Sequence, residues 1–456
     1  MNFSVTGQHV IVIGAARSGL AAADLLVRRG ARVTLSDVKK AIDGADDLVE
    51  RGVTLELGGH SAETFMRADL IVVSPGVKLD LPMLVSARAA GIPVMGELEL
   101  ASRWLRGRVI AVTGTKGKST TTTLAGRMLE HSGFRVRVGG NIGVPLSAQV
   151  DDSTADTLHV VEASSFQLQA TDTFHPWIAA LLNFSPDHLD QHASIEEYAA
   201  AKAAIFQRQS ASDWAVVNAD DASAERLAAS SRARRVRYGL SIAGDGFTVA
   251  DDVIVERRSA TAMPLVPVAA VRVPGRHILS DVVAAAAISR TAGAVPDAMH
   301  AAVSGFAGLE HAMEVVDTVE GVRFVNDSKA TNIESARRSI ESVPSHLVVV
   351  MGGRYKGGDF RSLAAPLANR ALAVVALGEA APLIEAALAD VVRVERAASM
   401  TDAVRTAFGF APQGGTVVLA PACSSFDMFR DYAERGRAFK EEVRRLAVER
   451  RATREQ

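Results

Sequence analysis

Residues 109–131 contain a strand, a glycine-lysine loop and a helix in direct succession. The apolar run Val109–Val112 predicts a buried parallel strand. The loop Gly114–Thr120 follows, and Ser119–His131 is predicted as a helix with its apolar residues on one face. In this order the backbone N–H groups of the loop and of the helix N-terminus form a concave anion site. The segment predicts a nucleoside triphosphate site within an α/β fold.

The side chains of this loop suit the binding of phosphate and magnesium. Lys118 is expected to reach the terminal phosphates, and the Ser119 hydroxyl to lie on Mg²⁺. The loop is shorter than the general G-x-x-x-x-G-K-[ST] pattern, because Val112 stands five residues before Gly117. The alternative is a glycine turn that merely ends a strand, but the lysine and the hydroxyl pair favour phosphate. We assign ATP binding to Gly114, Thr115, Lys116, Gly117, Lys118, Ser119 and Thr120.

Composition predicts an ordinary globular protein and argues against several classes of partner. A length of 456 residues suggests about three domains. The formal net charge of −2 gives no electrostatic reason to expect nucleic acid or an anionic membrane. The single cysteine, Cys423, fits a reducing cytoplasm. Since no signal peptide or membrane-spanning run is visible, we expect a cytoplasmic protein without membrane insertion.

The N-terminal segment shows the pattern of a nucleotide-binding α/β unit. The strand Val10–Ile13 runs into the turn Gly14–Gly19, and an acid, Asp37, ends the next strand. This spacing is typical of a dinucleotide fold, but the central glycine that admits a pyrophosphate is missing. A nicotinamide site and a related nucleotide pocket are both left open. Ser74-Pro75-Gly76 ends the strand Leu70–Val73, where it either lines a ligand crevice or forms a plain turn.

The middle segment places polar groups at the ends of further strands. Glu162 ends a strand expected beside the phosphate-loop strand, where it either binds Mg²⁺ or remains a solvated acid. His188 lies between two acids and is either a ligand or a loop histidine. Lys202 lies on an amphipathic helix, where a lysine is usually a solvated charge. Short β-branched runs between Phe247 and Val273 predict hairpins at the edge of the domain.

The C-terminal segment alternates strands and helices again, and Gly305–Gly308 is the expected hinge before it. This alternation predicts a parallel sheet with right-handed crossovers, and a final helix from about Asp427 to Val448. Polar loops follow three of the strands, at residues 326–332, 352–358 and 421–427. They form either an anion site at one sheet edge or a set of ordinary polar turns.

Seven motifs together resemble those of the Mur ligase family. In chain order they are G-T-K-G-K-S-T at 114–120, G-G-N-I-G at 139–143, E-A-S-S-F-Q-L at 162–168, N-F-S-P-D-H-L-D at 183–190, Y-A-A-A-K at 198–202, D-S-K-A-T-N at 327–332 and A-P-A-C-S-S-F-D-M-F at 420–429. They span nearly the whole chain, and the last two favour a glutamate-adding member of the family.

The resemblance implies a fold and an activity. The fold is α/β in three domains: a Rossmann-like UDP-binding domain (1–100), a central P-loop ATPase-like domain with peripheral β-hairpins (101–307) and a Rossmann-like glutamate-binding domain (308–456). The activity is ATP-dependent addition of glutamate to UDP-N-acetylmuramoyl-L-alanine through an acyl phosphate, in the synthesis of peptidoglycan precursors. D-glutamate is the expected substrate, two Mg²⁺ ions are implied, and a monomer is expected.

The same resemblance assigns roles to individual residues. Lys202 matches a family lysine that carries a carbamate, which replaces a cation by an anion facing Mg²⁺. The catalytic residues it implies are Lys118, Glu162, His188 and Lys202, and the metal ligands are Ser119, Thr120, Glu162, His188 and Lys202. Asp327 and Lys329 resemble nucleotide contacts. The substrate contacts it implies are Arg17, Ser18, Asp37, Ser74, Pro75, Gly76, Asn141, Ser164, Gln167, Thr331, Lys356, Ser425, Phe426 and Tyr432.

Some positions depart from the family pattern, and other functions stay open. Ile278 and Asp281 replace two asparagines, and the hinge reads Gly308-Leu309-Glu310-His311-Ala312 in place of G-L-P-H-R. Arg354 and Tyr355 replace the usual residues before Lys356. The alternatives are a ligase that adds L-glutamate, a ligase-like protein without turnover, and an oxidoreductase centred on Gly14–Asp37.

Overall fold

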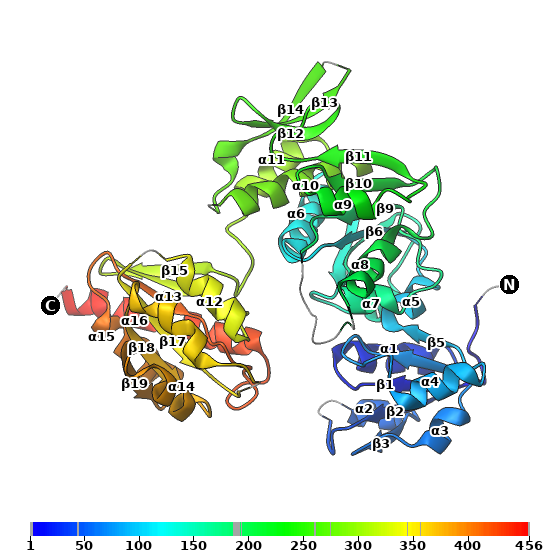
Figure 1. The fold of residues 1–456 in the computed structure, drawn as a ribbon, viewed down its shortest axis with the longest axis horizontal. Coiled ribbons are helices and arrows are strands. Elements are labelled where there is room, and N and C mark those ends of the chain that lie inside the picture. Colours follow the sequence, from blue (N-terminus) through cyan, green and yellow to red (C-terminus); the bar gives the residue numbers. More distant parts are fainter. Residues whose placement is uncertain are drawn as a thin grey trace. The chain divides into compact units, whose positions relative to one another are not determined.

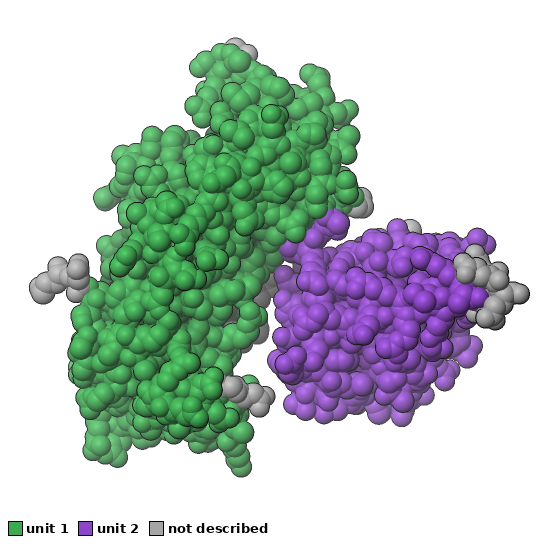
Figure 2. Space-filling model, turned by 180° about the vertical axis from the view of Figure 1, so that it is seen from behind, with its two compact units in different colours: residues 1–306 green, residues 307–456 purple. Residues whose placement is uncertain are grey.

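The computed structural model describes residues 3–42, 45–185, 192, 194–259, 261–273, 275–343, 345–355 and 357–454, with side chains up to 452. The chain divides into two compact units, residues 1–306 and 307–456 (Figure 2). Both units are built of α/β sheets, as the strand-helix alternation predicts. The predicted fold class is therefore confirmed.

The first sheet of the 1–306 unit is a parallel sheet with strand order β3-β2-β1-β4-β5 (Figure 1). Its strands are β1 (His9–Ile13), β2 (Arg32–Asp37), β3 (Thr54–Leu57), β4 (Leu70–Val73) and β5 (Val94–Gly96), and its helices are α1 (Arg17–Arg28), α2 (Asp46–Glu50), α3 (Ala62–Met66) and α4 (Pro82–Ala89). Alternate residues of β1 pack into two separate core clusters, with Val10 and Val12 in one and Ile11 and Ile13 in the other. Chain order reverses between β1 and β4, which is where such sheets bind ligands.

The second sheet of this unit has nine strands in the order β14-β13-β12-β11-β10-β9-β6-β8-β7. The parallel strands are β6 (Arg108–Thr113), β7 (Arg135–Gly140), β8 (Thr157–Glu162), β9 (Ile178–Leu181), β10 (Trp214–Asn218), β11 (Arg234–Tyr238) and β12 (Gly246–Ala250). Two antiparallel strands, β13 (Val253–Arg258) and β14 (Thr261–Pro267), extend the edge. Because β6 lies between β8 and β9, the phosphate loop follows a central strand of the sheet.

Seven helices accompany this sheet in the described part of the chain, and one of them, α10 (Arg276–Ala292), packs against the helix that follows the phosphate loop. They are α5 (Glu97–Ser102), α6 (Lys118–His131), α7 (Ser165–Gln169), α8 (Ile195–Ala203), α9 (Ala222–Leu227), α10 (Arg276–Ala292) and α11 (Pro296–Ser304). Both α10 and α11 pack against α6 (Figure 1). The predicted edge hairpins are present but end at Pro267; Val271–Val273 is not a strand, since a 3-10 turn at Val268–Ala270 breaks the extended backbone first.

The 307–456 unit contains one six-stranded sheet in the order β15-β16-β20-β17-β18-β19. Its strands are β15 (Glu314–Val319), β16 (Val322–Asn326), β17 (Leu347–Gly352), β18 (Ala371–Leu377), β19 (Arg393–Ala397) and β20 (Thr416–Leu419), of which only β15 is antiparallel to its neighbour. Its helices are α12 (Ile333–Glu341), α13 (Ala364–Ala368), α14 (Ala381–Leu388), α15 (Met400–Phe410) and α16 (Tyr432–Arg454). Since β16, β20 and β17 are neighbours, the three predicted polar loops leave the same edge.

The final helix begins later than the sequence predicts. It starts at Tyr432 rather than Asp427, because the Asp431 carboxylate accepts a hydrogen bond from the Glu434 N–H (2.7 Å) and so caps the first turn. No helix among the residues that the structure describes is both long and apolar enough to cross a bilayer.

Candidate active site

Two residues fix the conformation of the phosphate loop: a glycine with left-handed backbone angles and an asparagine that follows the neighbouring strand β9. Gly117 has φ = 80° and stands directly before α6, a backbone conformation that favours glycine. The Asn183 side chain accepts hydrogen bonds from the N–H groups of Thr115 (3.0 Å) and Lys116 (2.8 Å), and donates one to the Lys116 carbonyl (3.0 Å). Asn183 belongs to the motif at 183–190, and its position just after β9, the neighbour of β6, explains how it reaches the loop.

Two lysines from different helices converge on one carbonyl of the loop. Lys118 Nζ donates to the Gly114 and Thr115 carbonyls, both at 3.0 Å. Lys202 Nζ donates to the same Gly114 carbonyl at 2.7 Å and lies 4.7 Å from the centre of the Tyr198 ring. Lys202 is 2% exposed, so the usual interpretation of a helix lysine as a solvated charge is wrong here. Its helix, α8, turns Tyr198, Ala201 and Lys202 inward together.

Glu162 carries an oxygen with the properties of a metal ligand. It ends β8, directly beside Val112 of the phosphate-loop strand, and is 2% exposed. Its Oε1 accepts a hydrogen bond from the Asn141 amide at 2.7 Å, whereas its buried Oε2 has no hydrogen-bond partner among the described residues. A buried carboxylate oxygen is costly to leave unpaired, and a hard cation satisfies it. Asn141, predicted as a substrate contact, here orients Glu162.

Ser164 and Gln167, also predicted as substrate contacts, form the N-terminal cap of α7. The Ser164 hydroxyl accepts from the Gln167 N–H (3.3 Å), and Gln167 Oε1 accepts from the Ser164 N–H (3.0 Å). This capping box satisfies the first turn of the helix. Gln167 Nε2 is buried and has no partner in the described part of the chain, so it retains a donor for a ligand.

Two predicted residues lie outside the described residues: His188 and Lys356. Within the described ranges, no group of three or more histidine, cysteine, aspartate or glutamate side chains is placed to hold a metal ion. His192, which the sequence analysis did not consider, is buried beside the site. Its Nε2 lies 2.9 Å from the Ser165 hydroxyl and its ring stacks on Phe166.

The predicted contacts of the N-terminal sheet shape a glycine turn at the switch between β1 and β4. Asp37 accepts from the Ala15 N–H (2.6 Å), and Ser74 donates to the Gly14 carbonyl (2.7 Å). A Cβ on Gly19 would lie 1.8 Å from that same carbonyl, so only glycine fits there. Ser18 lies in the first turn of α1, directly before Gly19, and Pro75 and Gly76 directly follow Ser74 after β4, so all three adjoin this turn.

Arg17 extends from this turn to the glycine loop of the second sheet. It donates to the Gly143 carbonyl, in the loop that also carries Asn141. The two sheets of the 1–306 unit are therefore joined at the side where both sets of strand-end loops lie. This contact is between residues far apart in the chain, and no sequence pattern signals it.

In the 307–456 unit a buried arginine ties the three strand-end loops together. Arg435 of α16 is 1% exposed and donates to the carbonyls of Ser328 (3.0 Å), Gly352 (3.3 Å) and Cys423 (3.2 Å). Burial lowers the pKa of Arg435 to about 10. No sequence pattern singles out Arg435, because an arginine in a charged helix normally faces solvent.

The predicted ligand contacts of this unit fall into two groups. Asp327 is buried: Oδ1 accepts from the Met313 N–H (3.2 Å), and Ser339 donates to Oδ2. Burial raises the pKa of Asp327. The other group is more accessible: Phe426 is 62% and Tyr432 36% exposed, and Lys329 and Thr331 are half-buried. Ser425 is buried at the same edge. Their ligand roles stay predictions.

Replacing Asn183 with alanine is expected to loosen the phosphate loop. The loss of three hydrogen bonds should lower the free energy of unfolding by about 1–3 kcal/mol and weaken ADP binding. Thermal denaturation and calorimetric titration with ADP measure the two effects. A lower melting temperature with unchanged ADP affinity would show that Asn183 supports the fold without shaping the phosphate site.

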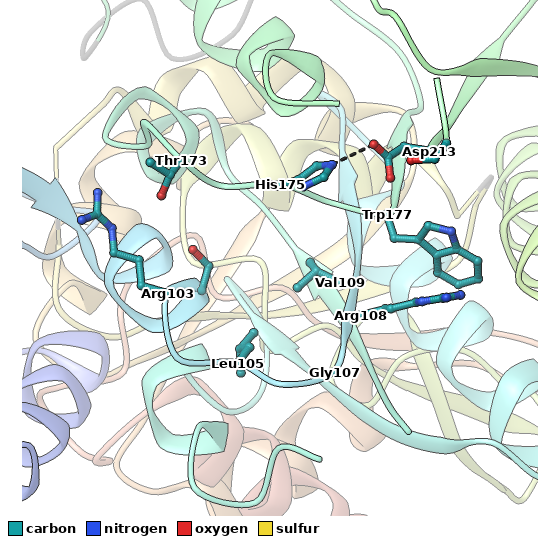
Figure 3. Close-up of a pocket in the computed structure, with 11 residues that line it drawn as sticks. Arg103, Leu105, Gly107, Arg108, Val109, Thr173, His175, Trp177 and Asp213 are labelled. Atoms are coloured by element: carbon teal, nitrogen blue, oxygen red, sulfur yellow. Dashed lines mark hydrogen bonds and ion pairs between the residues drawn. The ribbon is translucent and has the colours of Figure 1, made fainter. Parts of the chain in front are cut away.

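A pocket of about 470 Å³ lies at the opposite ends of these strands (Figure 3). Its lining includes Arg108, the first residue of β6, Trp177 directly before β9 and Asp213 directly before β10. Figure 3 shows His175 pointing to Asp213, with 2.7 Å between Nε2 and the carboxylate. Since the phosphate loop follows the carboxyl end of β6, this pocket is separate from the candidate site.

Comparison with protein families matches three successive parts of the chain. Residues 8–96 match "Mur ligase MurD-like, N-terminal domain", residues 112–289 match "Mur ligase middle domain", and residues 312–423 match "Mur ligase, glutamate ligase domain". The phosphate loop, Glu162 and Lys202 fall within the second match. The first match covers the glycine turn that had left an oxidoreductase open.

Curated relatives match over nearly the full length. A UDP-N-acetylmuramoylalanine–D-glutamate ligase of Acidobacterium capsulatum is 45% identical over 96% of both chains. The protein of the same name from Koribacter versatilis is 41% identical over 97% of this chain and 98% of its own. Among solved structures, UDP-N-acetylmuramate-alanine ligase MurC from Thermotoga maritima shares the fold, with a TM-score of 0.59 and 18% identity over 96% of this chain and 99% of its own.

Proposed function

The chain belongs to the Mur ligase family, and on that premise we propose that it joins glutamate to UDP-N-acetylmuramoyl-L-alanine with cleavage of ATP to ADP and phosphate. The sequence identity of 45% over 96% of a UDP-N-acetylmuramoylalanine–D-glutamate ligase carries this proposal. MurF ligase from Thermotoga maritima, solved in complex with ADP, shares the fold with a TM-score of 0.57 at 16% identity over 98% of this chain and 96% of its own. Peptidoglycan precursor synthesis is the corresponding process, and we place the reaction in the cytoplasm, where ATP is available.

The first step is transfer of the γ-phosphoryl group to the alanyl carboxylate. A carboxylate oxygen attacks phosphorus, the bond to the β-phosphate oxygen breaks, and ADP leaves. Such a step needs mainly alignment and neutralisation of charge. The N–H groups of Gly114–Thr120 hold the phosphates, and the Lys118 ammonium leaves the Gly114 and Thr115 carbonyls to contact the transferred group.

The described donor set fits Mg²⁺, which would neutralise phosphate charge when bound. Glu162 presents a buried, unpaired carboxylate oxygen, and the Ser119 and Thr120 hydroxyls lie at the start of α6. Asn141 fixes the orientation of Glu162. His188 belongs to the same proposed set. We include Lys202 in carbamylated form. Its side chain is buried beside the Gly114 carbonyl, and a negatively charged carbamate there would attract a metal cation, whereas the positively charged ammonium would repel it.

The second step is attack of the glutamate amine on the acyl phosphate. Nitrogen bonds to the carbonyl carbon, a tetrahedral intermediate forms, and phosphate leaves as the amine loses a proton. The 307–456 unit supplies the proposed glutamate contacts: Thr331, Lys356, Ser425, Phe426 and Tyr432. Arg435 fixes the loops that carry them by holding their carbonyls from inside. A lysine and hydroxyl groups suit the two carboxylates of glutamate.

Phosphate release tests the reaction and its stereochemistry together. With UDP-N-acetylmuramoyl-L-alanine, ATP and Mg²⁺, we expect phosphate and ADP to appear when D-glutamate is added. L-glutamate in place of the D-isomer serves as the control, and each product is identified by mass. Turnover only with L-glutamate would assign the other stereochemistry, and no turnover with either enantiomer would contradict the ligase proposal.

A further inference from the structure

Asp281 places a buried carboxyl directly against the phosphate loop, and the proposed reaction gives it no task. It lies in the second turn of α10 and is 8% exposed. A Cβ on Gly117 would lie 2.1 Å from Asp281 Oδ1 and 3.0 Å from Oδ2, so the carboxyl fills the space beside the turn that begins α6. Thr121 of α6 donates to the Asp281 backbone carbonyl at 3.5 Å. The packing of α10 on α6 therefore holds the acid beside the anion site.

The surroundings of this carboxyl offer it no cation. Among the described residues, no ion pair or hydrogen bond reaches its oxygens, and burial raises the pKa of Asp281 to about 7. Lys118, at the near end of α6, directs its ammonium to the Gly114 and Thr115 carbonyls. Of the strands packed on α10, β11 carries a buried titratable group, Tyr238, whose pKa is raised well above its usual value by burial and by the nearby acids. Those acids are Asp281, Asp221 and Asp220; the charged groups that start α10, Arg276 and His277, are exposed. The three arginines of β11 are exposed, and two of them pair with Glu225.

The charge of Asp281 affects how strongly a nucleotide can bind at the loop. The loop binds phosphates through its N–H groups, so several negative charges would lie within a few ångströms of the carboxyl. Two anions that close in a poorly hydrated site repel strongly, and a shared site of this kind raises the pKa of the protonatable member. The site accommodates both groups when the carboxyl carries a proton.

We propose that nucleotide binding at the phosphate loop takes up one proton, which resides on the Asp281 carboxyl. Asp281 then makes the affinity of the site for the nucleotide depend on pH. The proposal rests on the proposed nucleotide site but not on the identity of the acceptor or of the amino acid. It concerns binding alone and applies without a metal ion.

Calorimetric titration of the full chain with ADP in the presence of EDTA tests it. At pH 8 the phosphates of ADP are already ionised, since a phosphate loses its last proton near pH 6. Titrations in two buffers with different ionisation enthalpies give the number of protons taken up, and we expect a value near one. From pH 7 to 9 the Kd for ADP should increase, approaching about tenfold per pH unit.

Asp281→Asn is the matched variant, because it keeps the shape and removes the titration. We expect it to bind ADP without proton uptake, with a Kd independent of pH and about thirtyfold lower than that of the wild type at pH 8.5. Glu97→Gln is the control: Glu97 is another fully buried acid whose pKa burial raises, but it accepts its hydrogen bond from Ser147, away from the loop. That variant should retain the uptake.

The outcomes separate this proposal from the proposed function. ADP binding by the wild type without proton uptake at pH 8 would overturn the assignment to Asp281, whatever the variant does. Uptake that persists in Asp281→Asn would overturn it as well. No binding of ADP at any pH would instead overturn the nucleotide site itself, and this proposal with it.

The same carboxyl predicts how the melting temperature depends on pH. In the unfolded chain it loses its proton near pH 4, but in the fold it keeps the proton to about pH 7. The folded state therefore binds more protons between these values, and the stabilisation present below pH 4 is lost as pH rises to 7. Asp281→Asn should gain in melting temperature relative to the wild type between pH 5 and 8. An equal difference at both pH values would contradict the assigned titration.

Discussion

Lys118→Ala is expected to lower kcat about 10²–10³-fold, the usual cost of removing one preorganised donor from a developing charge. The Lys118 amine lies on the Gly114 and Thr115 carbonyls, so a short movement brings it to a phosphate held by the same loop. No other described side chain of the loop combines a positive charge with this partly buried position. The measurement is steady-state phosphate release with saturating substrates.

Lys116→Ala provides the matched control for Lys118. It removes a lysine from the same loop, but the Lys116 side chain is exposed, and the contacts of this residue to Asn183 are made by its backbone. We expect less than about a tenfold loss, since exposed charges contribute little. Equal losses in the two variants would contradict a specific role for the Lys118 ammonium.

Lys202→Ala should lower activity by about 10–100-fold, the effect typical of residues that support a metal site. The side chain is buried and reaches the Gly114 carbonyl at 2.7 Å, so alanine also leaves that carbonyl without this donor. If the residue acts as a carbamate, added formate or acetate should restore part of the activity by supplying an anion. Rates of phosphate release with and without these anions are compared.

Lys202→Arg distinguishes the carbamate from a purely structural lysine. Arginine retains the positive charge and can donate to the Gly114 carbonyl, but it forms no carbamate under the conditions in which lysine does. An inactive arginine variant together with anion rescue of the alanine variant would support the carbamate. Full activity of the arginine variant would refute it, and the ammonium would then be the functional form.

Most features that the sequence predicted correctly come from motifs of contiguous residues. The strand, loop and helix around Gly114–Thr120 are contiguous, so their pattern alone indicates the phosphate site. The convergence of three polar loops in the 307–456 unit was also predictable, because parallel strands place their carboxyl ends on one edge. The final helix was misplaced at its start, since the cap at Asp431 depends on which of several polar residues accepts the Glu434 N–H.

Residue environments set by distant contacts could not be predicted in the same way. Lys202 and Arg435 lie on helices whose composition allows solvent exposure, yet both are at most 2% exposed. Lys202 donates to the Gly114 carbonyl and Arg435 to three carbonyls, and a backbone carbonyl, which every residue possesses, leaves no mark in a sequence. Ser164 and Gln167 show the converse: their motif was noticed, but its immediate effect is a helix cap.

By itself the sequence determined the fold class and the phosphate chemistry, because strand periodicity and the Gly114–Thr120 motif act over neighbouring residues. The family resemblance named Glu162 and Lys202 for that chemistry, but only the tertiary structure decided how these side chains reach the loop and which others join them. It brought Asn183, Glu162 and Lys202 to the loop through the pairing of β6 with β8 and β9 and the inward face of α8. It also set Asp281 against Gly117, more than a hundred and sixty residues earlier. The burial of a side chain and the charges around it depend on tertiary packing. These two properties set the protonation and the hydrogen-bond partners of a carboxyl, an amine or an amide, and therefore what it can do.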